Sequence, residues 1–482
     1  MIQSMRRRLL PLVLALLLLI VVSVSALSSW DRVAGSPTVQ PVQTASMAAA
    51  NGSPFGVEEY AWGWRDVDTV TAQLSDLGVG WTRVNQLKWR DVEPVQGAKY
   101  DWTAYDQLLE KITSKGLAPI VVIADSPDWA LVDPNFQSGP IKDDCLDDFT
   151  SFVAAAVSRY SVAPFNIKYW ELFNEPDSTV GTYGPVIGSW GNYGAAYADM
   201  LKAVYPAVKA VDPDSRVVFG GLAYSSFLPA GPFNRAFLDD VLKAGGCQYF
   251  DVMNFHYYAV QAPEWATYGT DIAGKANYLR ERLSSHGCLG KSIIATEVGS
   301  FGRDESSFPG EQEQQAQYVA KVYSRGVAAG LGLLMWYSLN EGTDGTGLIG
   351  SGVLKPAYQA YKTMTLTLAE ASFARKLPAT LPLQPDASSF EGYAFHDNSA
   401  ANREIWVVWV NTGTATLRVR AEGVDAIDKF GQPVALVPGP AGYVDVPLST
   451  SPIYLRLPQY SVYVPNVLLA DYLGLTSIVH RG

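Results

Sequence analysis

Between residues 53 and 365 the chain alternates between two patterns of apolar and polar positions. Short runs that are apolar at nearly every position favour strands buried on both faces. Longer runs with apolar residues three or four positions apart favour amphipathic helices. The predicted strands are 55–57, 81–85, 118–123, 167–172, 216–220, 252–256, 292–296 and 332–337. The predicted helices between them are 67–77, 105–114, 146–160, 193–211, 236–244, 274–285, 311–329 and 356–365.

Such an alternation is typical of a parallel sheet with crossover helices, and eight strand and helix pairs close a (β/α)8 barrel, or TIM barrel. We therefore predict an α/β barrel over residues 52–370. From 371 to 465 short alternating runs are separated by Gly, Pro and Asn, which predicts a small antiparallel β-sandwich. We expect a structural role for this accessory domain, with sugar binding as the alternative. Its strands are expected at 404–410, 416–420, 443–448 and 453–457. The tail, 466–482, has an apolar stretch too short to span a membrane.

The N-terminus carries a targeting pattern. Three arginines at 6–8 precede an uncharged apolar run over 9–22, and small residues follow at 24–26. This order is that of a secretory signal peptide over residues 1–26. An uncleaved N-terminal membrane anchor is the alternative, because the apolar run can be extended a little on either side. In both cases the rest of the chain is exported, and residues 27–51 form a flexible linker rich in Ser, Ala and Pro.

The composition excludes several classes of partner. The net charge is −11, and no basic patch follows the N-terminal arginines, so nucleic acid is not expected to bind. The four histidines show no paired metal-ligand spacing, and the three cysteines are too few for a cysteine-based zinc site. No glycine-rich phosphate loop follows an early strand, so we expect neither a metal nor a nucleotide cofactor. An acidic exported chain rich in Trp and Tyr suits a neutral polar ligand.

The cysteine positions predict one disulfide. Cys247 lies five residues before Val252, and Cys288 lies five residues before Ile293. Equal offsets from two neighbouring strands place both cysteines on loops at the N-terminal face of the barrel, so we expect them to pair. Cys145 is then left as a free and buried thiol.

Two glutamates carry the candidate chemistry. Glu175 belongs to WELFNEPD, residues 170–177, just past the fourth predicted strand, and the following Pro176 favours extended angles at Glu175. Glu297 follows the seventh predicted strand in KSIIATEVGSFG, residues 291–302. Active sites of TIM barrels lie at the C-terminal ends of the strands, so the two carboxylates can face each other across the mouth. Glycoside hydrolysis uses such a pair, whereas either glutamate alone fits an ordinary solvated loop residue.

The chain resembles the clan A glycoside hydrolases. The motif residues are Asn174, Glu175 and Pro176 after strand four, Thr296 and Glu297 at strand seven, Arg83 at the end of strand two, His256, Tyr257 and Tyr258 at strand six, and Trp336 on strand eight. Within the clan, WELFNEPD and SPDWA (126–130) are most similar to family 39, the β-xylosidase and iduronidase family, or to family 5. The resemblance implies that Glu175 is the acid/base and Glu297 the nucleophile.

The same resemblance implies roles for the neighbouring residues. Arg83 holds the nucleophile ionised by lowering its pKa, while burial and the adjacent charge raise the pKa of Glu175. Asn174 contacts the 2-hydroxyl of the sugar. Because residues two apart on a strand share a face, His256 and Tyr258 point into the site and Tyr257 points away. Trp336 is expected to form the floor of the cleavage subsite, with a core position as the alternative. Outer sugar platforms are expected among Trp62, Trp64, Trp129, Trp89, Trp190 and Trp265, although each of these alone fits core or loop packing.

Together these features predict a secreted retaining glycosidase that acts on oligo- or polysaccharides by double displacement. The two carboxyl groups are then expected to lie about 5 to 5.5 Å apart. A carbohydrate-binding cell-surface protein without turnover is a second hypothesis, although such a protein has no need of both glutamates. A transglycosidase, which passes the glycosyl group to another sugar, is a third.

Overall fold

The computed structural model describes residues 53–59, 66–179, 189–224, 232–342, 345–378, 383–384, 389–398 and 403–458. All of them belong to one compact unit, residues 43–482. The predicted signal segment, linker and C-terminal tail, together with Trp62 and Trp64, lie outside the described residues. No helix in the described ranges is both long and apolar enough to cross a membrane.

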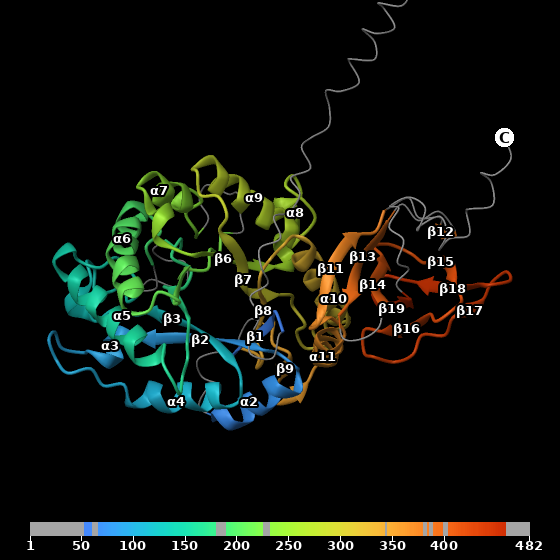
Figure 1. The fold of residues 1–482 in the computed structure, drawn as a ribbon, viewed down its shortest axis with the longest axis horizontal. Coiled ribbons are helices and arrows are strands. Elements are labelled where there is room, and N and C mark those ends of the chain that lie inside the picture. The colour runs from blue at the N-terminus through green and yellow to red at the C-terminus, as the bar shows by residue number, and fades with distance from the viewer. Residues whose placement is uncertain are drawn as a thin grey trace, which may run out of the picture. The chain divides into compact units, whose positions relative to one another are not determined.

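Eight parallel strands form a closed barrel in sequence order (Figure 1). They are β1 (Phe55–Glu59), β2 (Trp81–Lys88), β3 (Ala118–Ala124), β4 (Tyr169–Leu172), β5 (Arg216–Phe219), β6 (Val252–Tyr258), β7 (Ser292–Gly299) and β8 (Leu334–Tyr337). Most positions of these strands are buried, as expected for strands covered by helices on the outside and by packed side chains inside. The predicted TIM barrel is therefore confirmed.

Helices surround the barrel and connect successive strands. The main ones are α2 (Val67–Asp76), α4 (Thr103–Ser114), α5 (Leu146–Tyr160), α6 (Gly194–Val211), α7 (Phe237–Lys243), α9 (Ile272–Ser285), α10 (Glu311–Ala328) and α11 (Pro356–Leu368), and the short α3 (Trp89–Val92) and α8 (Ala262–Trp265) lie in loops. In α5, Phe149, Phe152, Val153 and Ala156 are buried, which is the three-and-four spacing of a helix with one apolar face.

The barrel interior is layered. An apolar cluster that includes Trp81, Ile120, Ile294 and Met335 fills the barrel toward the N-terminal ends of its strands. Arg83 lies two residues beyond Trp81 on β2 and so points to the same face. Polar and charged side chains occupy this next layer, on the way to the C-terminal ends of the strands. The site is therefore built on an apolar base.

Several strands run further than the sequence predicts, β2 and β7 by the most. Strand β2 continues to Lys88, so Arg83 lies inside it and not at its end. Strand β7 continues to Gly299, and Glu297 pairs in register with His256 of β6. Backbone pairing with both neighbours extends the strands past the point where polar side chains begin, because these polar groups find partners inside the barrel.

Antiparallel sheets follow the barrel, as predicted. One has the order β11 (Ala371–Lys376), β13 (Phe390–Asp397), β14 (Arg403–Val410), β19 (Ile453–Pro458) and β16 (Asp425–Asp428). The other has the order β12 (Leu383–Gln384), β15 (Ala415–Arg420), β18 (Tyr443–Leu448) and β17 (Val437–Pro438). Their inner faces share a core that includes Trp406, Leu417, Val446 and Leu455. A two-stranded hairpin, β9 (Ile349–Gly350) and β10 (Val353–Leu354), precedes α11.

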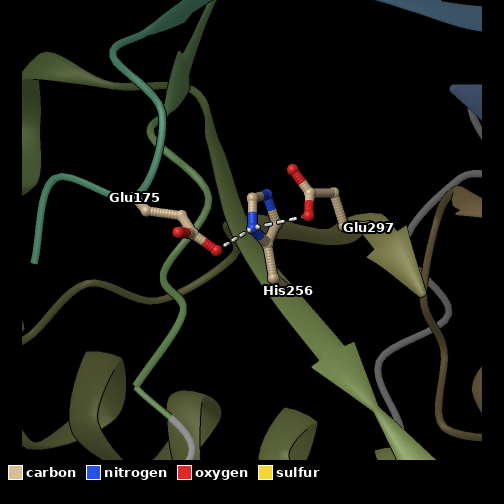
Figure 2. Close-up of side chains that lie close together, drawn as sticks. All are labelled: Glu175, His256 and Glu297. Atoms are coloured by element: carbon tan, nitrogen blue, oxygen red, sulfur yellow. Dashed lines mark hydrogen bonds and ion pairs between the residues drawn. The ribbon is translucent and has the colours of Figure 1, made fainter. Parts of the chain in front are cut away.

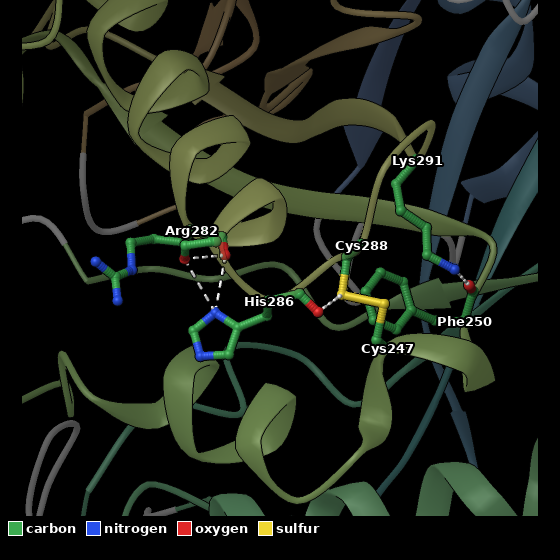
Figure 3. The surroundings of a disulfide bond; sticks show 7 residues. Cys247, Phe250, Arg282, His286, Cys288 and Lys291 are labelled. Carbon is green, nitrogen blue, oxygen red and sulfur yellow. Dashed lines mark hydrogen bonds between the residues drawn. A yellow bond between two sulfur atoms is a disulfide. The ribbon is translucent and has the colours of Figure 1, made fainter.

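Cys247 and Cys288 are joined in a disulfide with the sulfur atoms 2.07 Å apart (Figure 3). Cys247 lies in the turn before β6 and Cys288 in the turn between α9 and β7, so the bond links two loops at the N-terminal face of the barrel. Lys291 reinforces this link by donating a hydrogen bond to the carbonyl of Phe250. Cys145 is free and buried, and burial is the main cause that raises the pKa of its thiol.

Candidate active site

The charged layer of the barrel is organised around Arg83. Its Nη1 group donates to Glu58 Oε2 at 2.9 Å and to Glu297 Oε1 at 2.8 Å. Nε and Nη2 donate to the two oxygens of Glu171 at 2.9 and 2.7 Å, and Nη2 also donates to Asn174 Oδ1 at 2.7 Å. Four barrel strands and the loop after β4 thus meet at one guanidinium, and this contact fixes the position of Glu297.

The two predicted catalytic glutamates face each other across a histidine ring (Figure 2). His256 Nδ1 lies 2.9 Å from Glu175 Oε1 and 3.4 Å from Glu297 Oε2. One oxygen of each carboxylate and one nitrogen of the ring lie within 4.8 Å of one another. Retaining glycosidases have carboxyl groups about 5 to 5.5 Å apart and inverting enzymes about 6.5 to 9.5 Å. So close an approach of the two carboxylates fits the retaining class and not the wider spacing of the inverting class.

These three side chains are also the ones, among the described residues, whose ligand atoms lie close enough together to hold a metal ion. The neighbouring guanidinium disfavours a metal ion there, because Arg83 contacts Glu297 at 2.8 Å and already supplies a positive charge.

The two carboxyl groups differ in proton affinity. Burial raises the pKa of Glu175 well above its ordinary value, and the charge of Glu297 raises it further. Burial raises the pKa of Glu297 as well, while Arg83 and the Tyr258 hydroxyl, which donates to Oε2 at 2.7 Å, lower it. The predicted lowering by Arg83 is confirmed, but the loss of hydration on burial outweighs it, so the pKa of Glu297 is raised overall. The proton of the pair nevertheless favours Glu175, which has the stronger rise.

The backbone around Glu175 departs from the prediction. Glu175 and Phe173 adopt φ values of 44° and 64°, so Glu175 is left-handed rather than extended. Phe173 is fully buried against Trp190, with ring centroids 5.1 Å apart, and its N–H donates to Ile123 at 2.9 Å. These contacts and the two backbone N–H bonds that Asp177 accepts hold the turn. Strain of this kind persists where the surroundings determine it, and it commonly marks functional sites.

The orientation of the His256 ring depends on residues that sequence reasoning did not single out. Nε2 lies 3.3 Å from Thr296 Oγ1, and Asn254 binds this hydroxyl through Nδ2 at 2.8 Å. On the other side, a Cβ atom at Gly221 would lie 2.1 Å from Nε2, so the ring packs directly on this glycine. Burial lowers the pKa of His256 well below its ordinary value, and the ring is neutral.

The aromatic residue at the mouth is not the predicted one. Trp336 has no exposed surface, and its Nε1 donates to the carbonyl of Thr346 at 3.0 Å, so it cannot serve as a sugar floor. Because strand side chains alternate, Tyr337 takes the opposite face. Tyr337 is half-buried and packs edge-on against Tyr258, with centroids 6.4 Å apart. Counting the alternation back from the strand end would have favoured it.

The tryptophans predicted as outer sugar platforms differ in how deeply they are buried. Trp129 is half-buried and lies edge-on to Trp89 at 5.0 Å between centroids. The packing alternative holds for three of the candidates, Trp89, Trp190 and Trp265, which are fully buried and belong to the core. Tyr257 points away from the site as predicted, and its buried hydroxyl donates to Asp271 at 2.9 Å, which is a packing role.

Comparison with known proteins gives the family. The model of the cellulase family, glycosyl hydrolase family 5, matches residues 45–341, more than half of the chain. No curated protein matches the chain by sequence. A family 39 glycoside hydrolase from Bacteroides cellulosilyticus WH2 superposes with a TM-score of 0.64 at 22% identity, covering 84% of this chain and 81% of that chain. A monomeric β-xylosidase from Caulobacter crescentus CB15 gives 0.59 at 17% identity, covering 86% and 98%.

The catalytic domain of the family 30 xylanase C from Talaromyces cellulolyticus gives a TM-score of 0.60 at 13% identity, covering 86% of this chain and 98% of that chain. At these identities the solved structures show a common fold, while the family model extends over the barrel and both candidate glutamates. The chain therefore belongs to the cellulase family, glycosyl hydrolase family 5, within the clan A glycoside hydrolases, and it is a retaining O-glycosyl hydrolase.

Proposed function

We propose that Glu297 is the nucleophile and Glu175 the acid/base of a double-displacement glycosidase. One observation carries the assignment. Arg83 and the Tyr258 hydroxyl both donate to Glu297, at 2.8 and 2.7 Å, and these contacts favour its ionised form. Burial and the charge of Glu297 raise the pKa of Glu175 more strongly, so Glu175 arrives protonated.

Each half of the reaction then balances. A carboxylate oxygen of Glu297 attacks the anomeric carbon, the bond to the leaving oxygen breaks, and Glu175 gives its proton to that oxygen. In the second half, Glu175 takes a proton from water, the water oxygen bonds to the anomeric carbon, and Glu297 leaves as a carboxylate. Asn174, whose Oδ1 is occupied by Arg83, directs its NH₂ group to the sugar 2-hydroxyl.

We further propose that the enzyme is exported and acts on β-linked plant polysaccharides or their oligosaccharides. The N-terminal sequence supports export. The family match to cellulases supports β-glucan substrates, and the fold shared with a β-xylosidase and a xylanase supports β-xylan. The aromatic floor in this proposal is Tyr337, since an apolar C–H face of a sugar packs on an aromatic ring.

The test begins with a panel of aryl β-glycosides, xylan and β-glucans, and with the variants Glu175→Gln and Glu297→Gln. Glu281→Gln, an exposed glutamate on α9, is the matched control. Both site variants are expected to lose more than about 1,000-fold in kcat/KM, a typical cost for a group acting in the transition state. Equal activity in Glu297→Gln and wild type would refute the assignment.

Azide separates the two roles. In Glu297→Gly, azide replaces the missing nucleophile and yields the glycosyl azide of inverted configuration. In Glu175→Gly, azide replaces water at the glycosyl enzyme and yields the retained product. Dinitrophenyl glycosides need no protonation of the leaving group, so they should remain substrates for formation of the glycosyl enzyme by Glu175→Gly. Sugar binding without turnover by the wild type would favour the binding protein, and sugar products longer than the substrate would favour a transglycosidase.

A further inference from the structure

We propose that Glu58 on β1 is a positioning residue that carries a proton in the working enzyme and thereby leaves Arg83 to the nucleophile Glu297. The proposal rests on the proposed function, because it concerns how that nucleophile is held. Glu58 has no exposed surface and does not reach the substrate. Its influence passes through the Nη1 group of Arg83, which it shares with Glu297.

The charged groups around Arg83 do not balance. Arg83 donates hydrogen bonds to three carboxyl groups, those of Glu58, Glu171 and Glu297. The side chains of Arg83, Glu58 and Glu171 are fully buried, and that of Glu297 is 7% exposed. One cation against three carboxylates would leave two uncompensated negative charges in a dry interior. Such charges are strongly unfavourable, and a carboxyl group in this position takes up a proton instead.

The donors around each carboxyl group indicate where that proton resides. Glu171 accepts two N–H bonds from Arg83 and a third from the backbone of Gly221 at 3.0 Å, so it is the best held as an anion. Glu297 accepts from Arg83 and from a tyrosine hydroxyl. Glu58 receives one bond from Arg83 and a longer one, 3.2 Å, from the Asn85 amide.

Asn85 is suited to a carboxyl group in either state. Its amide presents an acceptor on one side and a donor on the other, and a half turn exchanges them. With the oxygen facing Glu58, the amide accepts the proton of a neutral carboxylic acid. With the NH₂ group facing Glu58, at 3.2 Å, it supports the ionised form.

The charged groups that face Glu58 act in opposite directions. Burial is the largest effect and raises the pKa of Glu58 to about 8; Arg83 from β2 lowers it, and Glu297 from β7 and Glu171 from β4 raise it. Glu59, the next residue on β1, is engaged by the loop after β8. The hydrogen-bond geometry and the number of charges therefore agree with the raised pKa of Glu58.

A neutral Glu58 has a functional consequence. As long as it holds its proton, the positive charge of Arg83 is divided between two carboxylates, one of which is the nucleophile. When Glu58 ionises, it competes with Glu297 for the same Nη1 group. The nucleophile then loses part of the contact that fixes its position, and the rate is expected to fall.

Variants at Glu58 and at Glu171 test this distinction, because they make the same chemical change on two sides of Arg83. Glu58→Ala is expected to lose about 10- to 100-fold in kcat/KM, because a donor of Arg83 is left unpaired. Glu58→Gln, the neutral isostere, is expected to rescue most of this loss at pH 6, whereas Glu171→Gln is not. If Glu58→Gln is as impaired at pH 6 as Glu171→Gln, Glu58 acts as an anion and the proposal is wrong.

A pH profile adds a readout that a merely structural role would not move. With a dinitrophenyl glycoside, formation of the glycosyl enzyme does not need the acid Glu175, so kcat/KM loses that alkaline limb. The wild type is then expected to decline with an apparent pKa near 8, and Glu58→Gln to lack this decline. The same alkaline limb in both proteins would overturn the proposal.

Infrared difference spectra separate this proposal from the proposed function. The wild type at pH 6 should show the carbonyl stretch of one protonated carboxylic acid that Glu58→Gln lacks, and this band should disappear as the pH rises through about 8. The measurement needs no turnover. If the band is present but the protein does not turn over substrate, the protonated Glu58 is supported and the proposed function is wrong. If the protein turns over substrate but the band is absent, only the proposal for Glu58 is wrong.

Discussion

The disulfide between Cys247 and Cys288 is expected to stabilise the barrel without contributing to catalysis. The two residues are 41 positions apart in sequence. Closing a loop of this length in the unfolded chain corresponds to about 4 kcal/mol at 25 °C. Dividing this free energy by the unfolding entropy of about 400 residues gives a melting temperature that is about 5 °C lower without the bond. The bond links the N-terminal ends of β6 and β7, away from Glu297, so kcat should not change.

The assay compares the wild type with the double variant Cys247→Ser/Cys288→Ser by scanning calorimetry and urea unfolding, with and without dithiothreitol. Reductant should lower the melting temperature of the wild type toward that of the variant and leave the variant unchanged. Cys145→Ser, which removes the free thiol, should still respond to reductant. A fall of less than about 1 °C on reduction of the wild type would refute the loop-entropy reasoning.

Two further predictions concern the site. Tyr258→Phe removes the hydroxyl that donates to Glu297 at 2.7 Å and lowers the pKa of Glu297. Its loss should therefore move the acid limb of the kcat/KM profile to higher pH, and an unchanged acid limb would contradict this. Gly221→Ala places a Cβ atom within 2.1 Å of His256 Nε2; displacement of the ring should reduce kcat/KM by about 10- to 100-fold while the protein stays folded by circular dichroism, and full activity would show that the ring is free to move.

The fold could be predicted because its pattern is repetitive and redundant. Strands buried on both faces and amphipathic helices leave different periods in the sequence, and helix α5 begins and ends where its apolar period predicts. Glu175 and Glu297 could be found because strand ends on a barrel share one face, whatever the lengths of the loops. Neither inference requires the register of one strand against another.

The features that could not be predicted depend on the register of the strands and on how completely the barrel excludes water. Trp336 and Tyr337 are neighbours on β8, and a shift of one residue decides which of them faces the site. The first strand was predicted over 55–57 only, which leaves Glu58 outside it. In the closed barrel the strand continues to Glu59, and Arg83 is the partner that makes a buried glutamate acceptable there. The sign of the pKa change at Glu297 depends on how completely water is excluded, which no linear pattern records.

The guanidinium of Arg83 has five N–H groups, and each of them is engaged: one on Nε, two on Nη1 and two on Nη2. A lysine, with three donors on a rotating ammonium, could not reproduce this arrangement. The planar group of Arg83 on β2 therefore holds side chains of β1, β4 and β7 in fixed relative positions. Because the nucleophilic carboxylate is held by these strands, the loops other than the turn that carries Glu175 can change in length and sequence while the chemistry stays in place. New sugar specificities can thus arise on this barrel without rebuilding its reaction centre.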